Sequence, residues 1–196
     1  MRVKLIQPAM GRRPMDTSLK ARMAPHLGLL TIARIVAEAG HEAVVVNENA
    51  EPDRPDEPVD LVGVTVTVDV LPQAIDIAER YRNRGVPVVA GGIQITADPE
   101  SARGHFDALC IGPAEGHWPR LLRDAERGAL AAEYRNDHPL REEEFLPPAR
   151  DLADASPYLM FNFLYRKYGR FSEALCRRIG YRRIGAFARL MGYAMR

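Results

Sequence analysis

Cysteine is scarce in this sequence: Cys110 and Cys176 are the only two among 196 residues. They form no metal-ligand pattern, because zinc and iron–sulfur sites need clustered cysteines or histidines at short, regular spacings. We therefore expect both to be reduced thiols, as in proteins that are not exported to an oxidising compartment.

Long hydrophobic runs are also missing. No stretch reaches the roughly eighteen apolar residues of a membrane-spanning helix. The start of the chain, residues 1–6, lacks the apolar core and cleavage site of a signal peptide and is typical of a first strand. We expect a cytoplasmic protein. The residues after this strand, 8–11, contain no GxGxxG motif, so a dinucleotide site is not favoured.

The composition is that of a globular protein, with 46% hydrophobic and 27% charged residues. The net charge of +1 hides an asymmetry. Residues 158–196 contain nine Arg/Lys and a single acidic residue, Glu173, so the remainder of the chain is acidic. The pattern predicts an acidic domain with a basic tail, and the two attract each other electrostatically.

Five short apolar runs alternate with helical patterns in the first two thirds of the chain. The strands are expected at 3–6, 41–47, 61–68, 86–90 and 107–111. This alternation predicts an α/β fold with a doubly wound, five-stranded parallel sheet, flavodoxin-like or Rossmann-like, in the order 2-1-3-4-5. We expect a domain over 1–130, a connector over 131–157 and a C-terminal amphipathic helical tail over 158–196.

Small or polar residues follow the predicted strands. Pro8 and a long loop follow the first, Thr65 and Thr67 lie at the end of the third, and Gly91-Gly92 follow the fourth. In such sheets ligands bind outside the carboxyl ends of the strands, at the switch point. Hydroxyl groups can contact a polar ligand, and paired glycines let the backbone approach a bulky one.

Several of these segments, taken in order, resemble a known family. The segments are PHLGLLTIA (25–33), AGHEA (39–43), VGVT (62–65), VVAGGIQIT (88–96) and DALCIG (107–112). They are similar to the N-terminal cobalamin-binding domain of cobalamin-dependent radical SAM enzymes. The resemblance covers roughly residues 1–130 in order and spacing.

The resemblance implies cobalamin held over the strand ends, with its nucleotide tail running between sheet and helices. It implies the following cofactor-binding residues: Pro8, Ala9, His26, Gly28, Leu29, Thr65, Thr67, Asp69, Gly91, Gly92, Gln94, Thr96, Gly112, Pro113 and Glu115. His26 lies nearest the expected cobalt face and is a candidate axial metal ligand. The alternative, which we favour, is a histidine that packs at a helix N-terminus. His117 follows Gly116 early in the last predicted helix, where it could contact a ligand, but we favour a surface position for it.

The sequence also departs from the family. Residues 145–158 are similar to the connector that leads into the radical SAM barrel, but no CxxxCxxC triplet follows. We therefore expect no iron–sulfur cluster, and no reductive cleavage of SAM by this chain alone. The DxHxxG motif of another cobalamin-binding class is absent as well, and Pro113 stands where the family often has glutamate.

A receiver-like domain is a weaker interpretation. Asp69 could serve as its phosphoacceptor, but such a domain also needs an acidic pair after the first strand and a lysine after the fifth. Those places hold Gln7-Pro8 and Gly112-Pro113.

The sequence thus predicts a cobalamin-binding protein that lacks the radical SAM cluster, used for cobalamin-dependent chemistry or for carriage and sensing. One alternative is a cobalamin-dependent methyltransferase or other non-radical enzyme. Another is an interaction protein with an empty crevice, whose basic tail docks a partner. Besides cobalamin, the partners expected for the chain are a separate enzyme or a small-molecule substrate. No nucleic acid is expected, and the lack of tryptophan in the tail disfavours membrane association.

Overall fold

The computed structural model describes residues 1–10, 25–136 and 138–152. The predicted tail and most of the first loop lie outside these ranges. The described strands are β1 (Arg2–Gln7), β2 (Glu42–Asn47), β3 (Leu61–Thr65), β4 (Val88–Gly91), β5 (Ala108–Ile111) and β6 (Glu133–Arg135). The helices are α2 (Leu27–Glu38), α3 (Leu71–Arg82), α4 (Ile93–Ala97) and α5 (Trp118–Glu126). The described ranges also contain four 3-10 turns: η1 (Pro99–Ala102), η2 (Ala114–Gly116), η3 (Glu142–Glu144) and η4 (Arg150–Leu152).

The strands form one parallel sheet in the order β2-β1-β3-β4-β5-β6. The predicted order 2-1-3-4-5 is confirmed, with the switch point between β1 and β3. The sheet has six strands where five were predicted. The sixth, β6, lies in the segment assigned to the connector and pairs with β5.

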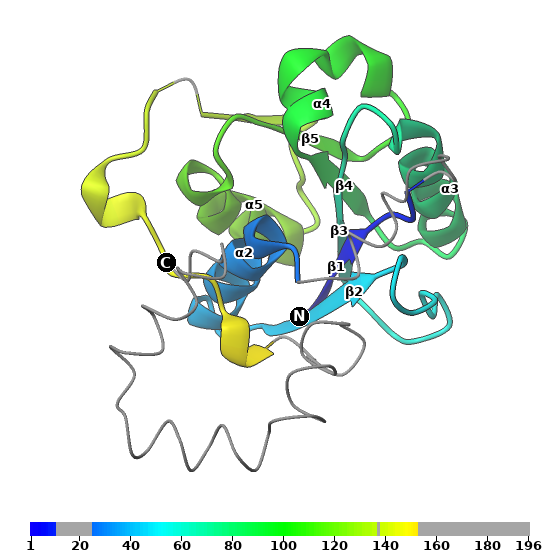
Figure 1. Cartoon of the computed structure of the whole chain (residues 1–196), viewed down its shortest axis with the longest axis horizontal. Coiled ribbons are helices and arrows are strands. Elements are labelled where there is room, and N and C mark those ends of the chain that lie inside the picture. The colour runs from blue at the N-terminus through cyan, green and yellow to red at the C-terminus, as the bar shows by residue number, and fades with distance from the viewer. Residues whose placement is uncertain (11–24, 137, 153–196) are drawn as a thin grey trace, which may run out of the picture.

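Helices cover both faces of the sheet (Figure 1). On one face α2 and α5 pack on alternate strand residues that include Val3, Leu5 and Val89. On the other face α3 packs on the intervening residues, such as Ile6, Val62 and Val88. This alternation follows from the two-residue side-chain period of a strand. Because both faces are covered, β3, β4 and β5 consist almost entirely of apolar residues and glycine.

A buried ion pair fixes the acidic loop after β2. Lys4, on β1, is fully buried, and its Nζ lies 3.2 Å from an Asp53 carboxylate oxygen. The same Nζ lies 3.0 Å from the Tyr81 hydroxyl and donates to the Arg54 carbonyl at 2.8 Å. The Tyr81 hydroxyl also donates to Asp53. A buried charge must be paired in this way, so the loop is held against β1 and α3.

Among the described residues, no helix combines the length and apolar character needed to cross a bilayer.

Candidate functional site

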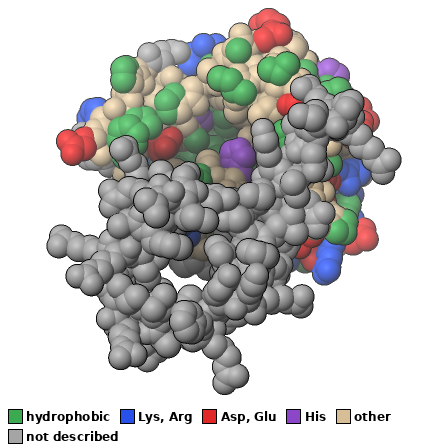
Figure 2. Space-filling view, viewed as in Figure 1, with side chains coloured by type: hydrophobic (Ala, Val, Ile, Leu, Met, Phe, Trp, Pro, Cys, Tyr) green, Lys and Arg blue, Asp and Glu red, His purple; other side chains and the backbone are tan. Residues whose placement is uncertain are grey.

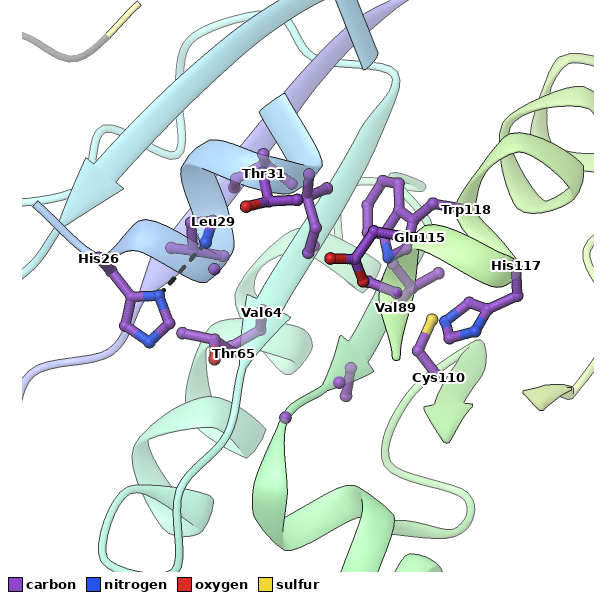
Figure 3. A pocket seen from close by; sticks show the side chains of 18 of the residues that line it. His26, Leu29, Thr31, Val64, Thr65, Val89, Cys110, Glu115, His117 and Trp118 are labelled. Atoms are coloured by element: carbon purple, nitrogen blue, oxygen red, sulfur yellow. Dashed lines mark hydrogen bonds between the residues drawn. The ribbon is translucent and has the colours of Figure 1, made fainter. Parts of the chain in front are cut away.

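A cavity of about 240 Å³ opens at the carboxyl edge of the sheet (Figure 3). It lies on the side of the sheet covered by α2 and α5, which is where a doubly wound fold places its ligand. Its lining residues come from β1, β3, β4, β5, α2, η2 and α5: Leu5, His26, Gly28, Leu29, Thr31, Ile32, Gly63, Val64, Thr65, Val89, Ala90, Gly91, Gly92, Cys110, Gly112, Ala114, Glu115, His117 and Trp118.

The inner part of the cavity is apolar. Leu5, Gly63 and Val89 come from three adjacent strands, and the Trp118 indole faces them from α5. A Cβ at Gly63 would lie 2.9 Å from Leu5 Cδ2 and 3.1 Å from Trp118 Cη2. Glycine is therefore required here for the indole and the leucine to pack against the strand.

The Gly91-Gly92 pair forms the outer part. Gly92 has φ 110° and ψ −175°, a conformation essentially restricted to glycine. A Cβ at Gly92 would lie 2.7 Å from the Val66 carbonyl oxygen and 3.3 Å from Thr65 Oγ1. The two adjacent strand ends thus approach each other closely, with backbone rather than side chains between them.

His26 is the N-cap of α2. Its Nδ1 accepts a hydrogen bond from the Leu29 amide at 3.2 Å, and burial lowers the pKa of the imidazole. A neutral imidazole whose Nδ1 accepts carries its proton on Nε2. His26 therefore serves as a helix cap, in line with the favoured alternative. Within the described ranges, no group of three or more His, Cys, Asp or Glu residues could hold a metal ion.

His117 is not at the surface, contrary to expectation. Its side chain is buried, with 4% of the residue exposed, and it lines the cavity opposite His26 (Figure 3). Burial lowers its pKa to about 4, so the ring is neutral at pH 7. Cys110 lines the same cavity, and burial raises the pKa of its thiol to about 12.

Other polar groups point into the cavity. The Glu115 carboxylate and the side chain of Thr31 face its interior, and Thr65 lies at the end of β3 (Figure 3). Three large apolar side chains close in sequence to lining residues are exposed: Leu27 between His26 and Gly28, Val68 after β3, and Ile93 directly after Gly92. Figure 2 shows hydrophobic side chains gathered around a hollow in which a histidine is visible. Exposed apolar side chains at a concave site are typical of ligand-binding surfaces.

The structure brings some of the predicted site residues together in this cavity: His26, Gly28, Leu29, Thr65, Gly91, Gly92, Gly112 and Glu115. It places the others outside the lining. Pro8 and Ala9 bind the loop after β2, through hydrogen bonds to Asn49 and Glu48. The Thr67 hydroxyl donates to Asp69 at 2.8 Å.

The remaining predicted residues sit near the edge but serve other contacts. The Gln94 amide donates to Ser101, and the Thr96 hydroxyl accepts from the Gly112 amide. Pro113 is exposed ahead of η2. Sequence reasoning missed the inner residues, above all Gly63 and Trp118. Gly63 is the only glycine inside a predicted strand, which is a signal for close approach.

Comparison with known proteins gives a consistent picture. Residues 21–122, just over half of the chain, match the model of the B12 binding domain. A curated relative, bacteriochlorophyllide d C-8(2)-methyltransferase of Chlorobaculum tepidum, is 29% identical over 120 residues. That match covers 61% of this chain and 27% of the relative, so the chain spans about a quarter of the relative's length.

Among solved structures, the N-terminal domain of a hypothetical protein from Thermotoga maritima is similar, at 21% identity and a TM-score of 0.40. The similarity covers 64% of this chain and 98% of that one. A TM-score this low supports no conclusion about ligands.

Proposed function

Because the chain belongs to the B12-binding domain family, we propose that it holds cobalamin at the carboxyl edge of the sheet, with the nucleotide tail in the cavity beneath. The observation that supports this most is the cavity itself, which combines an apolar inner part with a polar rim. The family match establishes a B12-binding domain, and the residues that contact the cofactor are part of the proposal.

The size of the cavity selects the part of the cofactor that enters. An apolar cavity of about 150 Å³ holds one benzene molecule. A volume of about 240 Å³ therefore suits a bicyclic aromatic base and is too small for a corrin macrocycle. The Trp118 indole and the bare backbone of Gly63 offer flat, apolar walls to such a ring.

The corrin would then lie over the opening. The glycine pair would present backbone to it, and the exposed apolar side chains of Leu27, Val68 and Ile93, which are close in sequence to lining residues, would be available for contact. Burying such side chains against a ligand contributes about 25 cal/mol for each Å² removed from water.

Cobalamin, when bound, supplies cobalt–carbon chemistry that protein side chains do not provide. The described residues hold and shield the cofactor. Glu115 and His117 line the cavity, but among the described residues no hydrogen bond or ion pair joins them as an acid–base pair. We therefore favour a binding module that carries cobalamin, or presents it to a separate enzyme.

Methyl transfer is the second candidate. It is favoured by one observation, the 29% identity to a protein named as a methyltransferase. Since the match covers 27% of that relative, the residues that would bind a methyl acceptor must be sought outside the matched part.

The test is retention of the cofactor. Purified protein is mixed with hydroxocobalamin and desalted, and its visible spectrum is recorded. We expect about one equivalent of cobalamin to be retained. A colourless protein would instead support the interaction protein with an empty crevice.

A pair of variants tests whether the retention of cobalamin depends on this cavity. Thr31→Trp places an indole on α2 where the side chain lines the cavity, and we expect retention to fall at least tenfold. Glu38→Trp is the matched control, because Glu38 is exposed at the other end of the same helix and does not line this cavity. Equal retention by both variants would place the cofactor elsewhere.

A further inference from the structure

His117 is a polar group without a partner. It is more than nine-tenths buried, and within the described residues neither Nδ1 nor Nε2 has a hydrogen-bond partner. Leaving a buried polar group unpaired costs about 1–3 kcal/mol. A protein that keeps such a group in its cavity wall sacrifices stability in the ligand-free state, which is common at binding sites.

The ring is held in place against the cavity. The His117 amide donates to the Ala114 carbonyl at 3.1 Å, and its own carbonyl accepts from the amides of Arg120 and Leu121. These bonds fix the backbone at the junction of η2 and α5. The side chain lines the cavity together with Cys110 from β5 and Trp118 from α5 (Figure 3).

The chemistry of the neighbours leaves the ring available to a ligand. Cys110 is a neutral thiol and a weak donor, and Trp118 offers only an indole N–H. Asn136 Nδ2 is another buried atom without a partner, but Asn136 packs against Gly116 and is not among the lining residues. Among the described residues with a buried side-chain atom that lacks a partner, His117 is therefore the one that lines this cavity.

Building on the proposed function, we propose that His117 is the specificity residue for the cofactor's nucleotide tail. A neutral imidazole offers one donor and one acceptor, which matches the ring nitrogen, sugar hydroxyls and phosphate of such a tail. The corrin ring itself, lying over the opening, does not need this contact. The protein should therefore distinguish a corrinoid that carries the tail from one that lacks it.

The experiment compares two ligands and two proteins. Dissociation constants for cobalamin and for cobinamide, which lacks the nucleotide tail, are measured by visible titration with the wild type and His117→Phe. We expect the variant to bind cobalamin about tenfold more weakly, the equivalent of one or two lost hydrogen bonds. Its affinity for cobinamide should change less than twofold.

Two further variants show whether hydrogen bonding by the His117 nitrogens, rather than the shape of the ring, determines the affinity for cobalamin. His117→Gln keeps one donor and one acceptor and should recover part of the affinity for cobalamin. His105→Phe is the matched control, because His105 is exposed and does not line the cavity. It should bind both corrinoids like the wild type.

The melting temperature of the ligand-free protein distinguishes this proposal from a structural role for His117. A structural role predicts that His117→Phe melts at a lower temperature than the wild type. Because His117→Phe removes two unpaired nitrogens, its melting temperature without ligand should equal or exceed that of the wild type. The proposal is overturned if cobalamin affinity is unchanged, or if both corrinoids weaken equally. A wild type that binds neither corrinoid would instead refute the proposed function itself.

Discussion

The turn between β4 and α4 is expected to tolerate no side chain at Gly92. Gly92→Ala adds one methyl group at a position whose φ of 110° and ψ of −175° suit glycine alone. The added Cβ would lie 2.7 Å from the Val66 carbonyl oxygen and 3.0 Å from the Val66 nitrogen. Both Val66 groups are already engaged, since the nitrogen donates to Gly91 and the oxygen accepts from Gln94. Neither can move without breaking a backbone hydrogen bond.

The magnitude follows from two contributions. The backbone strain alone costs about 1–3 kcal/mol. The contact with Val66 adds an overpacking cost of about 1–3 kcal/mol. We expect Gly92→Ala to lower the free energy of unfolding by about 3–4 kcal/mol.

Gly104→Ala is the matched control for this substitution. Gly104 also has a positive φ, of 83°, but a Cβ there would meet nothing within 4 Å. Its substitution should cost only about 1–2 kcal/mol, the penalty of a left-handed conformation. Urea denaturation of the three proteins measures the difference. If both variants lose equal stability, the close approach of the β3 and β4 ends is not as described.

Three other outcomes are expected. Lys4→Met leaves Asp53 buried without its cation and should cost about 3–5 kcal/mol in urea denaturation. His26→Ala removes the α2 N-cap, which should cost about 1 kcal/mol and leave the bound cobalamin spectrum unchanged; a spectral shift would show imidazole on cobalt. Burial lowers the pKa of His117 from 6.5 to about 4, so the unfolded chain takes up a proton on this ring more readily than the folded protein. The free energy of unfolding therefore keeps its full value above pH 6.5 and falls as the pH is lowered toward 4. Between pH 7 and 4.5 the wild type should therefore lose about 2 kcal/mol more stability than His117→Phe.

The sheet could be predicted because its central strands are buried on both faces. Apolar runs such as 61–65 and 88–90 are visible in the sequence, and right-handed crossovers limit the topology. β6 carries no such signal. It has three residues, of which only Tyr134 is buried. Its place depends on pairing with β5, which lies far away in sequence, and on the Tyr134 hydroxyl, which donates to Asp124 and accepts from the Ala131 amide.

The candidate site was predicted in outline for the same reason. Strand ends locate the glycine pair and Thr65, but the strand period does not continue past Thr65, so Thr67 turns away and binds Asp69. His117 could not be assigned from sequence. Its burial depends on η2 and α5, which place the Trp118 indole against Gly63 and bring the preceding histidine into the cavity wall.

A crystal structure of the protein with cobalamin tests the central claim most directly. We predict density for the aromatic base beside Trp118 and Gly63, with the tail within hydrogen-bonding distance of a His117 nitrogen, and the corrin over Gly91 and Gly92. Cobalamin bound at another surface, with this cavity empty, would contradict the account.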